Sequence, residues 1–245
     1  MQIRYFFLLF ILAVLAACDK PASKGSDSLL LTFGDREMDV EPYQTRVIIT
    51  PEFMRFDDGE GATDFLLFDR KQKTIYSVVQ SNKSITIIKS DVMEAKPPFD
   101  LKLGKKQIDD LKDAPTMEGV SPVHHVYMSG EQICFEAISV PGFLPAYVQA
   151  MKEFNDVLAE DSKLTLNNLP ADMHNGCNLA RSIFAPNRHL QDGFPVQVWS
   201  PDGSHSVLLD FKKDYVADKT LFELPSSYQK LDIQQIRASL AKQKS

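Results

Sequence analysis

The sequence has little cysteine, no long hydrophobic run and no block of like charges, and each shortage restricts the class of protein. Its longest unbroken apolar stretch covers residues 6–17, whereas a helix that spans a bilayer needs roughly twenty apolar residues. The formal net charge is −6 and no basic patch is present, which argues against nucleic acid as a partner. The 245 residues suit one domain of moderate size or two small ones.

Sequence motifs for catalysis and for cofactor binding are also missing. No Gly-x-Ser-x-Gly elbow and no phosphate-binding glycine loop occurs. His124 and His125 are adjacent in a predicted strand, so they point to opposite faces and cannot bind one metal together. His174 and Cys177 have the spacing of two metal ligands on a helix, but a catalytic zinc needs about three and no third is evident. The sequence predicts no catalytic residue, no metal and no cofactor, and leaves open a hydrolase without a recognisable motif.

The N-terminal apolar stretch ends at residues 15–18, which read Leu-Ala-Ala-Cys. Arg4 supplies a positive charge before the stretch, and small residues precede the cysteine, so this segment resembles the signal peptide and lipobox of bacterial lipoproteins. The resemblance implies that residues 1–17 are removed and that Cys18 is acylated. Several acyl chains on one residue anchor a protein firmly to a membrane. A plain secretory peptide with a chance cysteine is the alternative.

The residues after Cys18 predict where the protein lies and how its body is connected. Asp19 directly follows the cysteine, which in proteins resembling those of enteric bacteria implies retention at the inner membrane, facing the periplasm. Residues 18–28 are polar and small, as in a flexible tether. We expect a single domain over residues 29–232 and a weakly ordered tail over 233–245, with a short, polar and weakly held helix after residue 232.

Strand patterns dominate the N-terminal half of the chain. Polar turns between the segments are short, so neighbouring strands are expected to be antiparallel. Several of these strands are apolar on both faces, and both faces of the sheet therefore need cover. Helices can cover one face, and a second layer, a partner or a lipid-like ligand would have to cover the other. The expected strands lie at 29–33, 43–50, 53–56, 64–69, 74–80 and 84–89.

The C-terminal half combines helices with further hairpins. Apolar residues at helical spacing predict helices over 143–160 and 170–184, the second with Asn168 as N-cap, and 105–112 is expected to form one or two helical turns. Strands are expected at 123–128, 131–139, 194–199 and 205–211. The predicted class is α+β, with a curved antiparallel sheet of about eight to eleven strands and two main helices packed on or in its concave face.

Two features of the sequence can be interpreted either as ordinary packing or as part of a binding site. Tyr147, Met151 and Phe154 share a stripe of the first predicted helix, which either lines a ligand hollow or forms core. Trp199 lies near a turn, where an exposed tryptophan can serve as an interaction anchor. The sequence alone leaves both questions open.

Cys134 and Cys177 are the two cysteines that remain besides Cys18. An exported chain meets an oxidising compartment, where cysteines pair. Cys134 lies within a predicted strand, and Cys177 lies on the apolar face of the second predicted helix. Because a helix packed on a sheet brings such positions within bridging range, we predict a Cys134–Cys177 disulfide that closes a loop of about 44 residues.

Two C-terminal segments carry a further resemblance. The run 193–195 leading into a hairpin, and the later run 221–228, resemble the C-terminal signature of uncharacterised bacterial envelope proteins with a layout similar to the LolA/LolB-like lipoprotein carriers. That resemblance implies a strongly curved sheet, or incomplete barrel, with a hydrophobic hollow. It implies a lipid-anchored protein that binds a hydrophobic ligand or an acylated protein in the concave face of its sheet. The alternative is an envelope interaction or structural module whose core is filled by its own helices. Neither expectation fixes an oligomeric state.

Overall fold

The computed structural model describes residues 28–89, 93–166 and 173–243. Within these residues twelve strands form one open sheet in the order β12-β6-β5-β4-β3-β2-β1-β11-β10-β9-β8-β7. All neighbouring strands are antiparallel except β12 and β6, which are parallel. The strands are β1 Leu29–Arg36, β2 Tyr43–Ile49, β3 Phe53–Asp57, β4 Phe65–Asp69, β5 Thr74–Val79, β6 Ser84–Lys89, β7 Leu103–Ile108, β8 Val123–Ser129, β9 Gln132–Val140, β10 Phe194–Trp199, β11 His205–Lys213 and β12 Gln229–Asp232.

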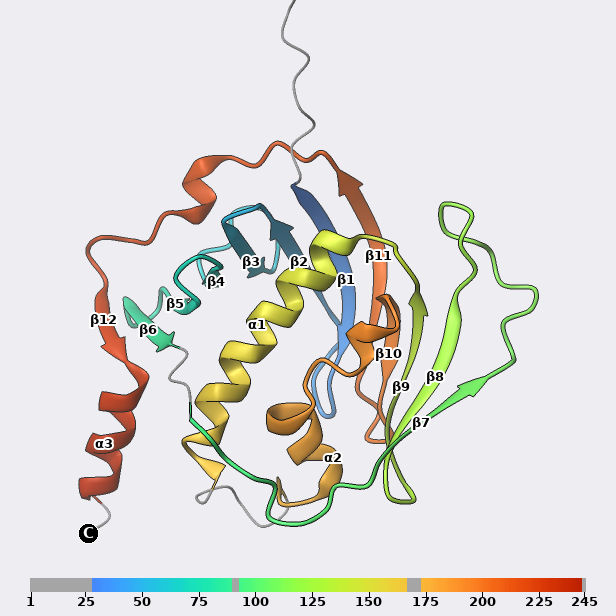
Figure 1. Cartoon of the computed structure of the whole chain (residues 1–245). Helices are drawn as coiled ribbons and strands as arrows, with labels where there is room; N and C mark the ends of the chain where they lie inside the picture. The colour runs from blue at the N-terminus through green and yellow to red at the C-terminus, as the bar shows by residue number, and fades with distance from the viewer. Residues whose placement is uncertain (1–27, 90–92, 167–172, 244–245) are drawn as a thin grey trace, which may run out of the picture.

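The helices gather on one face of this sheet, which bends around them (Figure 1). The long helix α1, Pro145–Lys163, contacts β2, β5, β6 and β10. Proline at the start of α1 suits the first helical turn, where its missing N–H costs nothing. A short helix α2, Gly176–Leu179, continues into a π-helical turn η3, Ala180–Phe184, that packs beside α1. The sheet-dominated α+β class is therefore confirmed, with an open sheet.

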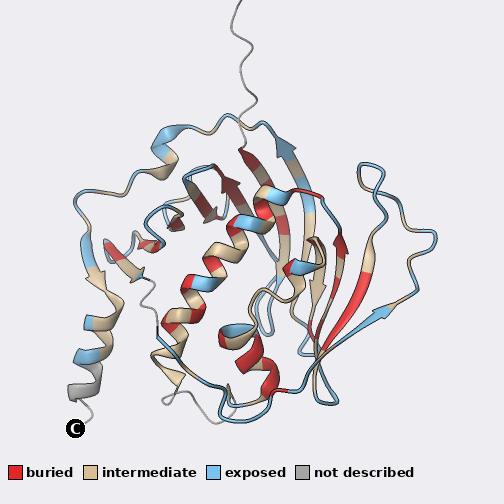
Figure 2. Cartoon of the chain, viewed as in Figure 1, coloured by how far each residue is buried: buried red, intermediate tan, exposed pale blue. Residues whose placement is uncertain are grey.

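The main core lies between α1 and the sheet, and buried positions recur along both (Figure 2). Phe154 of α1 packs against Phe56 and Phe68 at ring-centroid distances of 5.0 and 5.7 Å. Nearer the other end of the core, Tyr147 packs against Phe194 at 4.8 Å. The concavity beside α1 is thus filled largely by apolar and aromatic side chains of the chain itself.

The outer face of the sheet, which points away from α1, is also buried where the strands of the N-terminal half of the chain lie. Ile48 and Leu67 point to this face and are 0% and 1% exposed. The segment 214–228 covers part of it: Phe222 stacks on Phe53 at 5.4 Å, and the carbonyl of Leu221 accepts a hydrogen bond from Arg55. The chain therefore buries part of the outer face with its own segment 214–228. This agrees with the expectation that strands apolar on both faces need to be covered on both sides.

A buried ion-pair group strengthens the contact between this outer face and its cover. Asp57 accepts hydrogen bonds from Arg46 at 2.6 Å and from Arg55 at 2.5 Å, and its side chain is 1% exposed. Burial alone would raise the pKa of Asp57, but the two guanidinium groups outweigh it and hold the pKa below its usual range. Arg55 also lies over the ring of Phe65 at 3.7 Å.

The C-terminal helix α3, Ile233–Gln243, follows β12 directly. Arg237 forms a bidentate pair with the buried Asp161 of α1, at 2.6 and 2.7 Å. Gln234 donates to the same carboxylate at 3.2 Å. The segment that the sequence analysis separated as a tail thus contains a helix held against α1.

Several sequence-based boundaries need correction. Residues 105–112 were expected to be helical, but residues 105–108 belong to the edge strand β7, in which each of them pairs with a residue of β8. The second helix does not run unbroken over 170–184: its described part begins at Gly176 with Asn175 as N-cap, and Asn168 lies outside the described residues. The sheet has more strands than expected, since β7 and β12 were not predicted.

Most predictions about the N-terminal segment concern residues that lie outside the described ranges. Cys18, Asp19, the signal peptide 1–17 and nearly all of the tether 18–28 lie there, so lipidation and sorting stay predictions. Over the described ranges, no helix is both long and apolar enough to cross a membrane.

Candidate functional site

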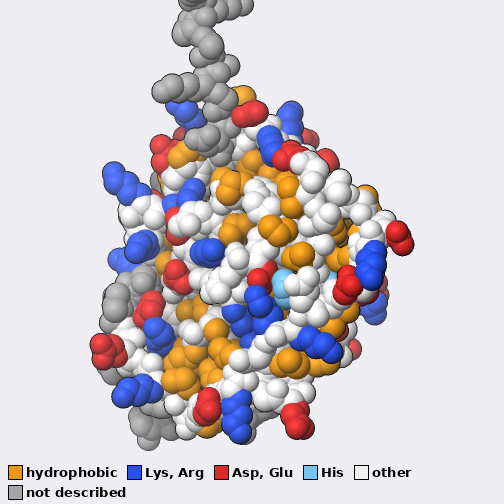
Figure 3. Space-filling model, turned by 45° about the vertical axis from the view of Figure 1, so that its right-hand side comes forward, with side chains coloured by type: hydrophobic (Ala, Val, Ile, Leu, Met, Phe, Trp, Pro, Cys, Tyr) orange, Lys and Arg blue, Asp and Glu red, His pale blue; other side chains and the backbone are white. Residues whose placement is uncertain are grey.

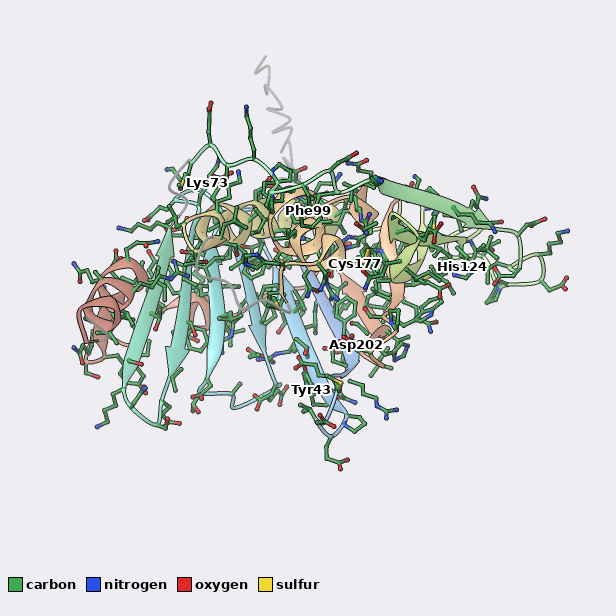
Figure 4. The ribbon with its side chains drawn as sticks, turned by 90° about the horizontal axis from the view of Figure 1, so that it is seen from below. Tyr43, Lys73, Phe99, His124, Cys177 and Asp202 are labelled. Carbon is green, nitrogen blue, oxygen red and sulfur yellow. A yellow bond between two sulfur atoms is a disulfide. The ribbon has the colours of Figure 1, made fainter. Side chains whose placement is uncertain are left out.

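A pocket of about 280 Å³ opens at one end of the concave face. We call it the mouth pocket. It lies where α1, η3 and the 3-10 turn η4, His189–Gln191, meet the ends of β1, β10 and β11. In Figure 4, Tyr43 and Asp202 mark this end, where the β1–β2 and β10–β11 connections emerge together. The pocket is lined by Phe33, Asp35, Arg36, Glu37, Tyr43, Tyr147, Met151, Arg181, His189, Pro195, Val198, Trp199, Ser200, Ser204, His205 and Ser206.

One part of the mouth pocket is apolar and largely preformed. Phe33 and Tyr147 are core residues whose rings lie 5.7 Å apart. Met151 lies one helical turn after Tyr147 and also lines the pocket. Burial and the nearby charge of Asp35 raise the pKa of Tyr147, so its hydroxyl stays protonated at neutral pH. These side chains offer an aromatic and thioether surface to a ligand.

The polar part of the pocket carries charges of both signs. Asp35 and Arg36 end strand β1, and Arg181 projects from η3. π-Helical turns are rare and are often found at functional sites. Arg181 donates one long hydrogen bond of 3.4 Å to Ser200 Oγ. Glu37 is occupied differently, because it accepts a 2.6 Å hydrogen bond from the hydroxyl of Tyr43.

Two further lining residues have strongly shifted pKa values. Burial lowers the pKa of His189 to about 4, and the positive charges of Arg181 and Arg188 act in the same direction. His189 is therefore neutral at neutral pH. The hydrogen bond to Glu37, together with burial, raises the pKa of Tyr43 to about 12. Neither residue adds charge to the pocket under physiological conditions.

The cysteine pair lies immediately beside the mouth pocket. The sulfur atoms of Cys134 and Cys177 are 2.06 Å apart and their Cα atoms 5.0 Å apart, so the predicted pairing is confirmed at disulfide-bonding distance. A neighbouring hollow of about 330 Å³ is lined by both cysteines and shares Arg181 and Ser200 with the mouth pocket. The disulfide thus fixes α2 to β9 just before the turn that carries Arg181.

His124 lies in a separate polar cluster on the sheet face away from the helices. Its ring nitrogens lie 3.0 Å from carboxylate oxygens of Asp110 and Glu136. Its ring packs at 5.2 Å from Trp199, which is half-buried rather than exposed. No group of three or more His, Cys, Asp or Glu side chains in the described ranges is arranged to hold a metal.

A second cluster joins η4 to strands β7 and β8. Asp192 accepts hydrogen bonds from Tyr127 and Lys105, both at 2.5 Å. Arg188 lies over the rings of Tyr127 and Phe135 at 5.4 and 5.1 Å. These contacts position η4, and with it His189, at the wall of the mouth pocket.

Sequence reasoning located part of this site. Of the predicted stripe, Tyr147 and Met151 line the pocket, whereas Phe154 lies in the core. It missed Asp35 and Arg181, which come from segments far apart in the chain. The one usable signal for Asp35 was alternation with Phe33, which places both side chains on the same face of β1.

Comparisons with known proteins give no family. No protein-family model matches the chain, and no curated protein matches it significantly. Matching solved structures include an uncharacterized conserved protein from Thermus thermophilus, at 12% identity and a TM-score of 0.43 over 84% of this chain and 91% of that chain. They also include PNGF-II in two space groups, C2 and P21, both at 9% identity, with TM-scores of 0.40 and 0.41 over 88% and 89% of this chain. The matched region spans about a third of the PNGF-II chain, 33% and 34% in the two forms.

Proposed function

We propose that this chain is a lipid-anchored protein of the bacterial envelope that binds a small ligand with an apolar part in the mouth pocket. The observation that carries the proposal is the pocket itself, where an aromatic wall meets separated charged groups at an open end of the concave face. Ligand sites commonly combine an apolar lining with a few placed polar groups.

The size of the pocket limits the ligand. Its volume of about 280 Å³ is near the lower end of the roughly 300–1,000 Å³ typical of ligand pockets. The rest of the concavity is occupied by α1 and its aromatic contacts. These dimensions favour one ring or a short chain over the several acyl chains of a lipoprotein.

The architecture supports the binding role that the resemblance to the lipoprotein carriers implies. The open sheet bends around α1 (Figure 1), as an incomplete barrel with a helix in its mouth would. The predicted anchor at Cys18 would hold such a barrel at the inner membrane, facing the periplasm. The ligand would then be taken from the periplasm or from the membrane surface.

Native mass spectrometry of protein isolated from cells tests the proposal. We expect an additional bound mass on the wild type and its loss on Met151→Trp, because the larger ring fills the pocket. Gln149→Trp is the matched control, since it adds the same ring to an exposed position of α1 outside the pocket. An equal bound mass on all three proteins, or none on any, would count against ligand binding at this site.

An interaction module is the second candidate, and the β1–β2 connection favours it. Met38 and Val40 are 64% and 47% exposed there. On the face shown in Figure 3, by contrast, Lys and Arg side chains interrupt the hydrophobic ones. A photocrosslinking residue at position 38, with position 106 of β7 as the control, distinguishes the candidates. A protein adduct specific to position 38 favours the interaction module.

A further inference from the structure

Two side chains of opposite charge face the mouth pocket without an ion-pair partner among the described residues. Asp35 comes from β1 and is half-buried, yet its carboxylate has neither a hydrogen bond nor an ion pair there. Arg181 comes from η3 and donates its one hydrogen bond within those residues to Ser200 Oγ, at 3.4 Å. The two line the same pocket but do not pair with each other.

This arrangement differs from that of three other partly buried carboxylates of the described residues. Asp57, Glu153 and Asp161 are each bound by an arginine. The carboxylate of Asp35 lines the pocket and can accept a hydrogen bond from a ligand there. A ligand with a positive group would satisfy Asp35, and a ligand with a negative group would satisfy Arg181.

Among the charged groups that line the pocket, Asp35 and Arg181 are the two expected to determine which ligand binds. The carboxylate of Glu37 already accepts the hydroxyl of Tyr43. His189 is neutral because burial lowers its pKa to about 4. Arg36, which is exposed like Arg181, adds a second guanidinium at the pocket and favours the same negative group. The aromatic side chains line the same pocket, and an apolar side chain of a ligand would pack against them.

We infer that the ligand is a small zwitterion with an apolar side chain, such as an apolar amino acid or a short peptide. Its ammonium group is held by Asp35 and its carboxylate by Arg181, while its side chain packs on Tyr147 and Met151. This inference rests on the proposed function, because it specifies the chemistry of the ligand bound in the same pocket.

Three probes with one phenyl ring test the inference on the full chain in phosphatidylcholine vesicles. They are L-phenylalanine, which carries both charges, phenethylamine, which carries only the ammonium, and 3-phenylpropionate, which carries only the carboxylate. Equilibrium dialysis measures binding. Loss of that binding on Met151→Trp, which fills the pocket, reports that the probe binds there. We expect phenylalanine to bind at least ~10-fold more tightly than either singly charged probe, the effect of one charge-assisted hydrogen bond.

Two variants separate the roles of the charges. Asp35→Asn should weaken phenylalanine and phenethylamine by about 10-fold and leave phenylpropionate unchanged. Arg181→Gln should weaken phenylalanine and phenylpropionate and leave phenethylamine unchanged. Lys106→Gln is the control, because Lys106 is exposed and lies outside the pocket.

The outcomes distinguish this inference from the proposed function. Equal binding of all three probes, sensitive to Met151→Trp, would overturn the zwitterion and retain the apolar pocket. Absence of probe binding would also overturn the zwitterion, and a Met151-dependent mass in native spectrometry would then still support the proposed function. Loss of both signals would overturn both.

Discussion

Removal of the Cys134–Cys177 bond should destabilise the domain strongly. The bond joins residues 43 apart in sequence, and for a loop of that length the chain-entropy model gives roughly 4 kcal/mol. A domain of about 200 residues shifts its melting temperature by about 2–4 °C per kcal/mol, so we expect a loss of roughly 8–16 °C. Because the bond fixes α2 just before Arg181, the mouth pocket should loosen first.

Urea unfolding of the full chain on vesicles, followed by Trp199 fluorescence, measures this effect. Cys134→Ser, Cys177→Ser and the double variant should lose the same stability, since each removes the same single bond. Reduced wild type should match them. If the two cysteines acted only through packing, the single effects would instead add in the double variant. Additive losses, or a loss below about 1 kcal/mol, would refute the reasoning.

Further predictions concern the anchor, the core and the pH response. Cys18→Ser should abolish incorporation of radioactive fatty acid; equal labelling of the variant and the wild type would exclude lipidation there. Asp19 predicts inner-membrane residence in a sucrose gradient, and exclusive co-sedimentation with outer-membrane markers would contradict it. Phe154→Ala should cost about 3–5 kcal/mol by leaving a cavity between α1 and the sheet, whereas Gln149→Ala should change urea stability little. Burial lowers the pKa of His189 from 6.5 in the unfolded chain to about 4 in the folded chain. Between pH 6.5 and about 4 the unfolded chain therefore binds more protons than the folded one. The free energy of unfolding should fall by up to roughly 3 kcal/mol as the pH drops through this range. His189→Gln should flatten that slope, and an unchanged slope would assign it to other groups.

Local patterns explain why the cysteine pair and the first helix were predictable. Cys134 lies in a strand that the alternation of Phe135 and Ala137 already defined, and Cys177 lies on the apolar side of its helix. The long helix α1 was indicated by the spacing of Tyr147 and Phe154 along a single segment. In each case the determining residues are close together in sequence.

The pocket and the sheet order depend on contacts that no local pattern encodes. Strand β12 is short, and its parallel partner β6 lies far back in the chain, so periodicity gave no sign of the pairing. Asp35 and Arg181 are ordinary surface residues by sequence. They become neighbours of one cavity only because β1, η3 and the β10–β11 hairpin meet at the same end of the sheet.

The position of β1 has a consequence for biogenesis. β1 is the first strand after the predicted tether, yet it lies inside the sheet, with β2 on one side and β11 on the other. Leu31 pairs with the nearby Val47, which can join early, and with Phe211, near the far end of the chain. Contacts between such distant residues form slowly because a long loop must close first. The first strand of the domain therefore keeps one edge unpaired until nearly the whole chain has been synthesised, and during this interval the edge could pair with another chain.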